Sequence, residues 1–472
     1  MTMKIDNWIP KTSSPSRWTF LGLLGAICLA SCAEPNLSLS DVHGTWRSDG
    51  YGWYITIEDG KASQVYHVMD GLCLQINNDE IGKTIAGLSP IALEKDGRSF
   101  TAATSENITQ FRFSKAEALP KDCANAGVLN PDPIANFEAA WKYFDIHYAF
   151  FAERKVDWQA VYRRYRPQVT PQTTSEQLYT ILGNMLAELN DRHVIIDHAD
   201  GREFRAGLGP VITPWVKDYG DDPQGAENLI DYVNIRMQPF KAIVEQKYMA
   251  GPVTKAGQGQ IVWGRLKGDV GYIRIDSLFY FDQRSGYKYQ KAELETAMAK
   301  ALKDLKGVKS FVIDMRFTLG GNDGLGLTLL SHFADKERLA YTKQARMGAG
   351  LTALQNIKAV PAKERFNGKV AVLIGNVTVS AGENFTMATL GFPHIVRVGE
   401  MTAGTLSDVL MKPLPNGWQV GISNEIFRAA HGHDVEISGV KPDIIVPGHF
   451  STQTLATKRD IVLETALSRL TQ

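Results

Sequence analysis

Short apolar runs separated by turn signals mark the first part of the chain as β structure. Between residue 44 and about residue 113, runs such as Trp53–Ile57 and Phe111–Phe113 place apolar side chains at every second position. That is the period of a strand with one buried face. Asp-Gly pairs, which favour tight turns, separate the runs. The pattern predicts a small antiparallel β domain over residues 44–128.

The spacing changes after the proline-rich break Pro131-Asp-Pro133. Segments 137–148, 158–165 and 175–189 are predicted to be helices. In the last segment the apolar residues recur three or four positions apart, as on one face of a helix: Leu178, Ile181, Leu182, Met185, Leu186 and Leu189. We therefore predict a helical subdomain over residues 133–200, whose last helix leads to a turn at Asn190–His193.

From about residue 264 the pattern alternates between strands and helices. Residues 270–275, 310–315 and 370–374 are largely apolar runs, and residues 294–305 have the apolar spacing of an amphipathic helix. Strands that alternate with helices imply a largely parallel sheet with crossover connections. The predicted fold class is α/β, with a mixed parallel sheet in a core over residues 201–450 and a C-terminal helix over 451–472.

The N-terminus has the pattern of a secretory leader. Residues 20–30 are apolar and uncharged and follow Lys4, Lys11 and Arg17. A membrane-spanning helix is the alternative, but a span needs about 20 apolar residues. We expect a signal peptide over residues 1–31.

The leader ends in Leu29-Ala-Ser-Cys32, which resembles the lipobox of bacterial lipoproteins. That resemblance implies lipidation of Cys32, followed by a tether over residues 32–43. The protein would then be exported and lipid-anchored in the bacterial cell envelope. Ala33 and Glu34 lack the aspartate that retains some lipoproteins in the inner membrane, which favours the outer membrane, facing the periplasm.

Length, charge and cysteine content bear on the number of domains, on nucleic-acid binding and on disulfide formation. The 472 residues suggest about three folding units. Lysine and arginine number 51, as do aspartate and glutamate, so no overall field favours nucleic acid. Besides Cys28 in the leader and Cys32 in the lipobox, Cys73 and Cys123 remain. In an oxidising compartment they would form a disulfide, and two buried free thiols are the alternative.

Two strand ends carry residues that could do chemistry, since ligands bind at the carboxyl ends of parallel strands. The first is followed by Gly320-Gly321, where the backbone could approach a ligand closely, or which could be a simple turn. The second leads to Ser380, at the expected start of a helix. A helix N-terminus could stabilise an oxyanion. The spacing of Ser380 and Glu383 equally fits a capping box without catalytic meaning.

Several strings in this order resemble the tail-specific and tricorn-core serine peptidases, over roughly residues 135–447. They are the sequence from Trp141 to Trp158, Leu189-Asn-Asp-Arg-His193, Val312-Ile-Asp-Met-Arg316 with Gly320-Gly321, Ser380-Ala-Gly-Glu383, Val398-Gly-Glu-Met-Thr-Ala-Gly404 and Glu436-Ile-Ser-Gly-Val-Lys-Pro-Asp443. The resemblance implies a crotonase-like catalytic core and hydrolysis of peptide bonds in peptides or proteins. No PDZ module is recognisable between residues 197 and 264.

The resemblance also implies roles for individual residues. Lysine-dyad members of the family carry their base where this chain has Thr405, whereas the tricorn-like branch uses a histidine at the place of His193 and an acid at the place of Glu436. Histidine can accept the proton of a serine nucleophile near neutral pH. Ser380 would be the nucleophile and His193 its base.

The remaining roles concern the oxyanion and the acid. The backbone N–H groups of Ala381 and of Gly320 or Gly321 would hold the oxyanion. The family's acid acts through a serine beside the histidine, but here that neighbour is Arg192. Glu436 would therefore pair with Arg192 or reach His193 directly.

Other readings compete with this one. His431 and His433 could be half of a zinc site, but no further spaced ligands complete it. Ser285 and Lys288 fit an S-x-x-K pattern that lacks its companion motifs. No metal or cofactor is expected. A ligand-binding lipoprotein on the same fold, without catalysis, and a structural envelope lipoprotein are the alternatives from other functional classes.

Overall fold

The computed structural model describes residues 37–69, 71–76, 87–104, 108–126, 129–207, 216–227, 229–432, 434–447 and 452–471. Residues Leu37–Gln472 form one compact unit. The expected leader, the lipidation site Cys32 and His433 lie outside the described residues. None of the helices in these ranges combines the length and the hydrophobicity that crossing a membrane requires.

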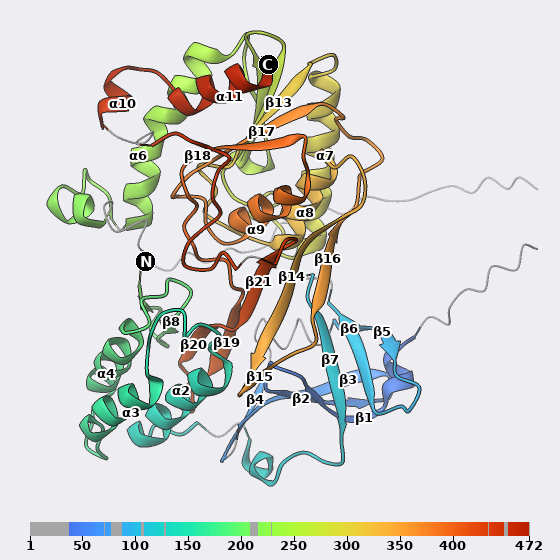
Figure 1. The fold of residues 1–472 in the computed structure, drawn as a ribbon. Helices are drawn as coiled ribbons and strands as arrows, with labels where there is room; N and C mark the ends of the chain where they lie inside the picture. Colours follow the sequence, from blue (N-terminus) through green and yellow to red (C-terminus); the bar gives the residue numbers. More distant parts are fainter. Residues whose placement is uncertain are drawn as a thin grey trace, which may run out of the picture. The chain divides into compact units, whose positions relative to one another are not determined.

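The first part of the chain folds into a seven-stranded antiparallel sheet, drawn in blue and cyan in Figure 1. After a 3-10 turn at Leu39–Val42, its strands are β1 (Gly44–Ser48), β2 (Trp53–Glu58), β3 (Lys61–Met69), β4 (Leu72–Ile76), β5 (Ser89–Leu93), β6 (Ser99–Ala103) and β7 (Gln110–Ala116), in the order β4-β3-β2-β1-β7-β6-β5. On β2, the alternating residues Trp53, Ile55 and Ile57 are buried. This sheet confirms the predicted antiparallel β structure.

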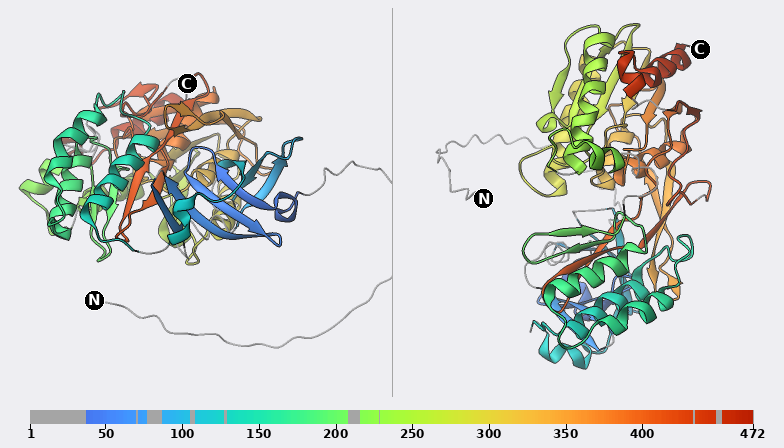
Figure 2. Two further views of the ribbon diagram at one scale, coloured as in Figure 1. Left: turned by 90° about the horizontal axis from the view of Figure 1, so that it is seen from below. Right: turned by 90° about the vertical axis from the view of Figure 1, so that its left-hand side faces the viewer.

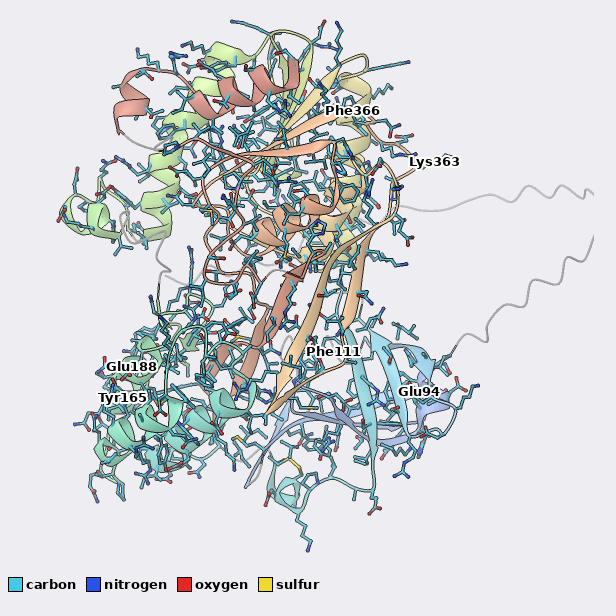
Figure 3. The ribbon with its side chains drawn as sticks, viewed as in Figure 1. Glu94, Phe111, Tyr165, Glu188, Lys363 and Phe366 are labelled. Carbon is cyan, nitrogen blue, oxygen red and sulfur yellow. A yellow bond between two sulfur atoms is a disulfide. The ribbon has the colours of Figure 1, made fainter. Side chains whose placement is uncertain are left out.

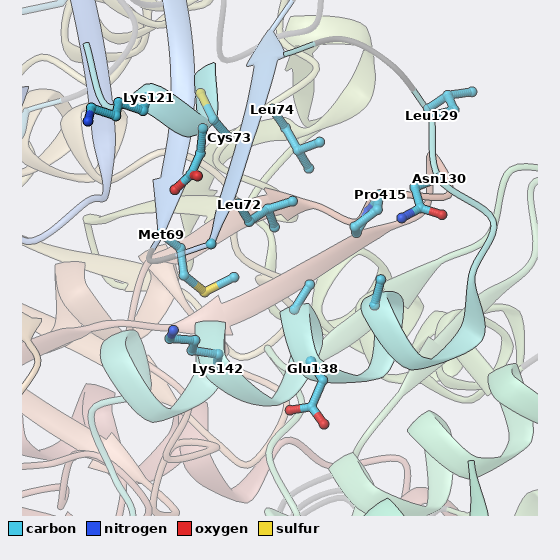
Figure 4. Close-up of a pocket in the computed structure, with 14 residues that line it drawn as sticks. Met69, Leu72, Cys73, Leu74, Lys121, Leu129, Asn130, Glu138, Lys142 and Pro415 are labelled. Carbon is cyan, nitrogen blue, oxygen red and sulfur yellow. The ribbon is translucent and has the colours of Figure 1, made fainter. Parts of the chain in front are cut away.

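Cys73 on β4 and Cys123 in the 3-10 turn Lys121–Asn125 form a disulfide, with Cα atoms 4.9 Å apart. The bond joins the end of the sheet to the segment that leads into the helices. A cavity of about 800 Å³ lies next to it, between this end of the sheet and the first helix (Figure 4).

Three helices follow: α2 (Pro133–His147), α3 (Trp158–Tyr165) and α4 (Ser175–Ala187). Asp132 caps α2 by accepting the N–H of Ala135, so the helix begins at Pro133, earlier than its apolar pattern indicates. The predicted apolar stripe of α4 packs inward, with Leu182, Met185 and Leu186 fully buried.

The central sheet has seven strands in the order β10-β11-β12-β13-β17-β18-β22. They are β10 (Thr254–Ala256), β11 (Ile261–Leu266), β12 (Val270–Ile275), β13 (Ser310–Asp314), β17 (Lys369–Ile374), β18 (Ile395–Gly399) and β22 (Ile444–Ile445). β10, β11 and β12 pair antiparallel, and β12 to β22 pair parallel. The mixed sheet of an α/β fold is therefore confirmed.

Both faces of this sheet are covered, which explains its continuous apolar runs. Ile313 and Val372 face the helices α7 (Tyr287–Asp304), α8 (Asp323–Ser331) and α9 (Ala381–Ala388), whereas their neighbours Val312 and Leu373 face α11 (Ile461–Thr471). Figure 1 shows these helices on the two faces. In place of one C-terminal helix, the structure has α10 (Thr452–Ala456) and α11, which Asp460 caps by accepting the N–H of Leu463 at 2.9 Å. Helix α6 (Leu229–Ile243) runs into a π-helical turn at Val244–Tyr248.

Two further sheets join these parts of the chain. One contains β14 (Arg338–Met347), β15 (Gly350–Leu351), β16 (Gln355–Ala359) and β21 (Glu425–Ala429). The other has the order β19-β20-β8-β9, with β8 (Ile195–Asp197), β9 (Glu203–Arg205), β19 (Val409–Pro413) and β20 (Gln419–Ser423). The antiparallel pairing of β8 with β20 brings the turn that follows α4 to the C-terminal part of the chain (Figures 1 and 2).

Candidate active site

Ser380 lies where the central strand β17 leads into helix α9, as the sequence predicts. It is the N-cap of α9, and its φ of 55° and ψ of −123° are unusual for a residue with a side chain. Such a conformation costs about 1–3 kcal/mol and persists only where the surrounding structure holds it. Ser380 N–H donates to the carbonyl of Thr405 at 3.0 Å, and Val379 N–H donates to Thr318 at 3.1 Å.

Glu383 fixes the backbone around Ser380. Its buried carboxylate accepts the N–H of Ser380 at 3.2 Å, and both halves of the capping box that the sequence allows are present. The same carboxylate accepts the hydroxyl of Thr402 and the N–H groups of Gly404 and Thr405, at 2.6, 2.7 and 2.9 Å. Burial raises the pKa of Glu383 to about 7, against the effect of these hydrogen bonds. Glu383 therefore links the start of α9 to segment 402–405.

Gly320 lies directly beside Ser380. A Cβ at Gly320 would be 3.0 Å from the Cβ and 3.6 Å from the Oγ of Ser380, and the φ of Gly320 is +101°. Gly321 is held against another segment, where a Cβ would meet the carbonyl oxygen of Leu278 at 2.3 Å. Within the described residues, no partner accepts the N–H groups of Gly320 and Ala381. Of the two glycines, Gly320 is therefore the nearer one to the serine hydroxyl.

His193 lies in the turn between α4 and β8 and is almost fully buried. Asp191 accepts its backbone N–H at 3.0 Å. Burial lowers the pKa of His193, and the positive charge of Arg192 lowers it further. The charges of Asp191 and Asp408 and a hydrogen bond with the backbone of Ser407 raise it, but they do not cancel the effect of burial. The imidazole is thus held in its neutral form. Its Nδ1 has no hydrogen-bond partner among the described residues.

Segment 405–408 connects the surroundings of the serine and the histidine. Thr405 accepts the N–H of Ser380, and the backbone of Ser407 is close enough to His193 to raise the pKa of the ring. Two residues of extended chain span at most about 7 Å. Residues far apart in the sequence, 193 and 380, therefore lie against the same short segment.

Glu436 stabilises this segment. Its Oε2 accepts the N–H groups of Leu406 and Ser407, at 2.8 and 3.1 Å, and its Oε1 lies 3.9 Å from the guanidinium of Arg154. Burial, together with the charges of Asp191 and Glu383, raises its pKa well above the usual value.

The expected contact of Glu436 with Arg192 or His193 is not what the structure shows. Among the described residues, Glu436 forms its one ion pair with Arg154, which also lies 3.3 Å from Asp191. Arg192 is half-buried, and burial lowers the pKa of its guanidinium. The negative charges of Glu383 and Glu203, which lie near it, partly offset that effect. Arg154 carries no sequence signal of its own, and Asp191 is visible only as a neighbour of His193.

A network of buried charges borders the site on its other side. Lys343 on β14, fully buried, donates to Asp408 at 2.8 Å and pairs with Glu425 at 2.5 Å. The charge of Asp408 acts on His193. Burial would raise the pKa of Asp408, but the positive charge of Lys343 and the hydrogen bonds with Glu425 and Lys343 together lower it. No group of three histidine, cysteine, aspartate or glutamate side chains in the described part of the chain could hold a metal ion.

Comparison with known proteins gives the family. Residues 269–446 match the model of peptidase family S41, and residues 132–187 match that of the tricorn protease C1 domain. These matches support peptidase family S41, with its tail-specific and tricorn-like members, for these two regions of the chain. The first match includes Ser380, Glu436 and the glycine pair Gly320-Gly321, whereas His193 and its string at residues 189–193 lie between the two matched regions. The antiparallel sheet at residues 44–116 is outside them.

Two individual proteins show similarity to this chain. A carboxyl-terminal-processing protease of Picosynechococcus sp. is 26% identical over 206 residues, which are 43% of this chain and 45% of that protein. The crystal structure of a candidate peptidase from Parabacteroides merdae is 24% identical and aligns with a TM-score of 0.57, over 72% of this chain and 97% of that one. The second similarity concerns the fold.

Proposed function

We propose that this S41 family member is a serine endopeptidase of the cell envelope, with Ser380 as its nucleophile and His193 as its general base. The observation that carries the proposal is the strained conformation of Ser380 at the start of α9, beside the N–H groups of Ala381 and Gly320, for which the described part of the chain supplies no acceptor. Strained backbone concentrates at functional sites. A serine that only caps a helix requires neither a strained backbone conformation nor N–H groups beside it that are available to an oxyanion.

The proposed reaction gives each of these groups one role. Ser380 Oγ attacks the carbonyl carbon of the substrate while His193 takes the hydroxyl proton. The oxyanion is held by the N–H groups of Ala381 and Gly320 at the positive end of α9. His193 then gives the proton to the leaving amine, and water hydrolyses the acyl-enzyme by the same route in reverse. The neutral imidazole, favoured by burial, is the form that can accept the proton.

Glu436 takes the part of a positioning residue in this proposal. It acts through the N–H groups of Leu406 and Ser407 and so holds the segment against which Ser380 and His193 lie. The carboxylates near the imidazole are Asp191 and Asp408, whose charges favour the imidazolium that forms during the reaction.

The location in the envelope is part of the same proposal. The leader, the lipobox at Cys32 and the disulfide between Cys73 and Cys123 support export to an oxidising compartment and lipid anchoring, with the outer membrane as the expected site. Metabolic labelling with radioactive palmitate, followed by membrane fractionation, tests this. Cys32→Ser is expected to lose both the label and the membrane association. An unlabelled wild-type protein would contradict lipid anchoring.

The test of the catalytic proposal is hydrolysis of unfolded casein, with product peptides identified by mass spectrometry. Ser380→Ala is expected to lose about 10⁴-fold or more in rate. Ser285→Ala, which changes the exposed serine of the S-x-x-K pattern, is the matched control and should retain full activity. Equal activity of wild type and Ser380→Ala would refute the proposed nucleophile. Absence of both hydrolysis and fluorophosphonate labelling in the folded wild type would favour a ligand-binding protein.

A further inference from the structure

The N-terminal sheet forms one wall of a small cavity beside the candidate site. The cavity has a volume of about 160 Å³. Its lining comes from the N-terminal sheet and its edge (Tyr51, Trp53, Thr109, Phe111) and from the C-terminal part of the chain (Asp408, Val409, Leu410, Met411, Asn424, Glu425). Figure 3 labels Phe111 on β7. The sheet lies outside the regions that match the family models, yet it reaches the surroundings of the site.

Hydrogen bonds fix this wall to the rest of the molecule. Tyr51 donates its hydroxyl to Glu425 Oε1 at 2.5 Å, and Lys343 donates to Thr109 Oγ1 at 2.8 Å. Lys343 also binds Asp408 and Glu425. The two residues from the sheet are thus held by Glu425 and Lys343, and Lys343 also pairs with Asp408, whose charge acts on His193. The cavity is a preformed part of the fold.

The cavity lies within reach of a substrate bound at Ser380. Segment 405–408 begins at Thr405, which accepts the N–H of Ser380, and ends at Asp408, which lines the cavity. Three residues of extended chain span at most about 10 Å. An extended peptide with its scissile bond at Ser380 would therefore place a side chain two or three residues away near the cavity.

The lining selects the chemistry of the occupant. The rings of Tyr51, Trp53 and Phe111 pack against one another, with centroids 4.8–5.2 Å apart, and Leu410 and Met411 add aliphatic surface. The one charge that is partly open is Asp408, whose side chain is 42% exposed and already paired with Lys343. A cation is not needed to balance it, and an anion would be repelled.

We propose that this cavity is a substrate subsite that takes a neutral, apolar side chain of leucine to phenylalanine size, two or three residues from the scissile bond. The subsite rests on the proposed peptidase function for its position along the substrate. The N-terminal sheet then contributes to selectivity by supplying the aromatic wall.

The test uses amidated decapeptides in which Leu, Phe, Ala, Glu or Lys replaces one residue at a time in an alanine, glycine and serine background. For the wild type, Leu or Phe at one position near the cleaved bond should raise kcat/KM about tenfold or more over Ala, and Glu should lower it. Val409→Phe fills the cavity from its rim, where Val409 is 37% exposed. This variant should lose the preference for Leu and Phe but still cleave the Ala peptide. Val360→Phe, at a residue 56% exposed and outside the lining, is the control and should keep the preference.

Binding of the same peptides to Ser380→Ala separates the subsite from the catalytic proposal. Fluorescence anisotropy of labelled peptides should show about tenfold tighter binding of the Leu peptide than of the Ala peptide, and Val409→Phe in the same background should abolish the difference. Cleavage without any such preference, or a preference that Val409→Phe leaves unchanged, overturns the subsite while the peptidase stands. If nothing is cleaved, the peptidase proposal fails and the binding difference alone decides the subsite.

Discussion

Arg316 offers a quantitative test of the forces that hold the catalytic core together. It follows strand β13 and is 1% exposed. Its guanidinium binds Asp314 at 2.9 and 2.6 Å and Asp460 at 2.9 and 2.8 Å, so each carboxylate receives two hydrogen bonds. Asp460 in turn caps α11. Replacing Arg316 by Met keeps much of the volume but leaves two buried carboxylates without their cation.

The magnitude follows from the cost of an unpaired buried charge. Removing one partner of a buried ion pair costs about 3–5 kcal/mol, whereas replacing the whole set by neutral residues is often nearly neutral. We therefore expect Arg316→Met to lower the free energy of unfolding by about 3–5 kcal/mol at pH 7. The triple variant Asp314→Asn, Arg316→Met, Asp460→Asn should recover most of this loss.

The pH dependence has a definite sign. Burial would raise the pKa of Asp314, but the charge and hydrogen bonds of Arg316 outweigh it and lower the pKa below 3.8. In the wild type the carboxylate therefore contributes stability that is present above pH 3.8 and is lost as the pH falls through the lowered pKa. In Arg316→Met the charge and side-chain hydrogen bonds of Arg316 are lost, so burial raises the pKa of Asp314 against the one remaining side-chain hydrogen bond, from Tyr272. The destabilisation by Arg316→Met should therefore be larger at pH 7 than at pH 4.

Urea unfolding followed by tryptophan fluorescence at pH 4 and pH 7 measures these differences. Arg338→Met is the matched control, because Arg338 forms a surface ion pair with Asp335 and should change the free energy of unfolding by no more than about 1 kcal/mol. A loss for Arg316→Met that equals that of Arg338→Met would refute the reasoning. So would a loss that does not depend on pH.

Three other substitutions test separate parts of the structure. Gly320→Ala puts a methyl group 3.0 Å from Ser380 Cβ at a φ of +101°, and should lower kcat about 10²-fold or more with little change in KM; an unchanged kcat would remove Gly320 from the oxyanion site. Cys73→Ser opens a loop with a sequence separation of 50 and should cost about 4 kcal/mol in urea unfolding, an expectation that equal stability of wild type and variant would contradict. Glu436→Ala removes the oxygen that accepts the N–H groups of both Leu406 and Ser407, and should lower kcat; unchanged turnover would rule out the positioning role.

Periodic elements could be predicted from the sequence because their signal is local. Strand β2 has an apolar residue at every second position, strands β12 and β17 are largely apolar runs, and helix α4 has apolar residues three or four positions apart. The structure has these elements at nearly the predicted bounds. The start of α9 at Ser380 also follows from local signals, because a strand, a short loop and a capping pattern are adjacent in the sequence.

Contacts between distant segments could not be predicted in the same way. The pairing of β8 with β20 involves three residues of each strand and places His193, but short strands carry little periodic signal. The partner of Glu436 is Arg154, and a surface-type arginine in a loop has no local mark that it will be buried. Likewise, no local signal predicts the hydrogen bond between Tyr51, in the turn before β2, and Glu425, because the two residues lie far apart in the sequence.

The pH dependence of fluorophosphonate labelling at Ser380 tests most directly whether His193 activates this serine. The account predicts that the labelling rate of the wild type rises through a single titration with a midpoint below 6.5, because burial lowers the pKa of His193. It predicts that His193→Gln labels about 10²- to 10⁴-fold more slowly and without that titration. Labelling of folded His193→Gln at the wild-type rate would contradict the account.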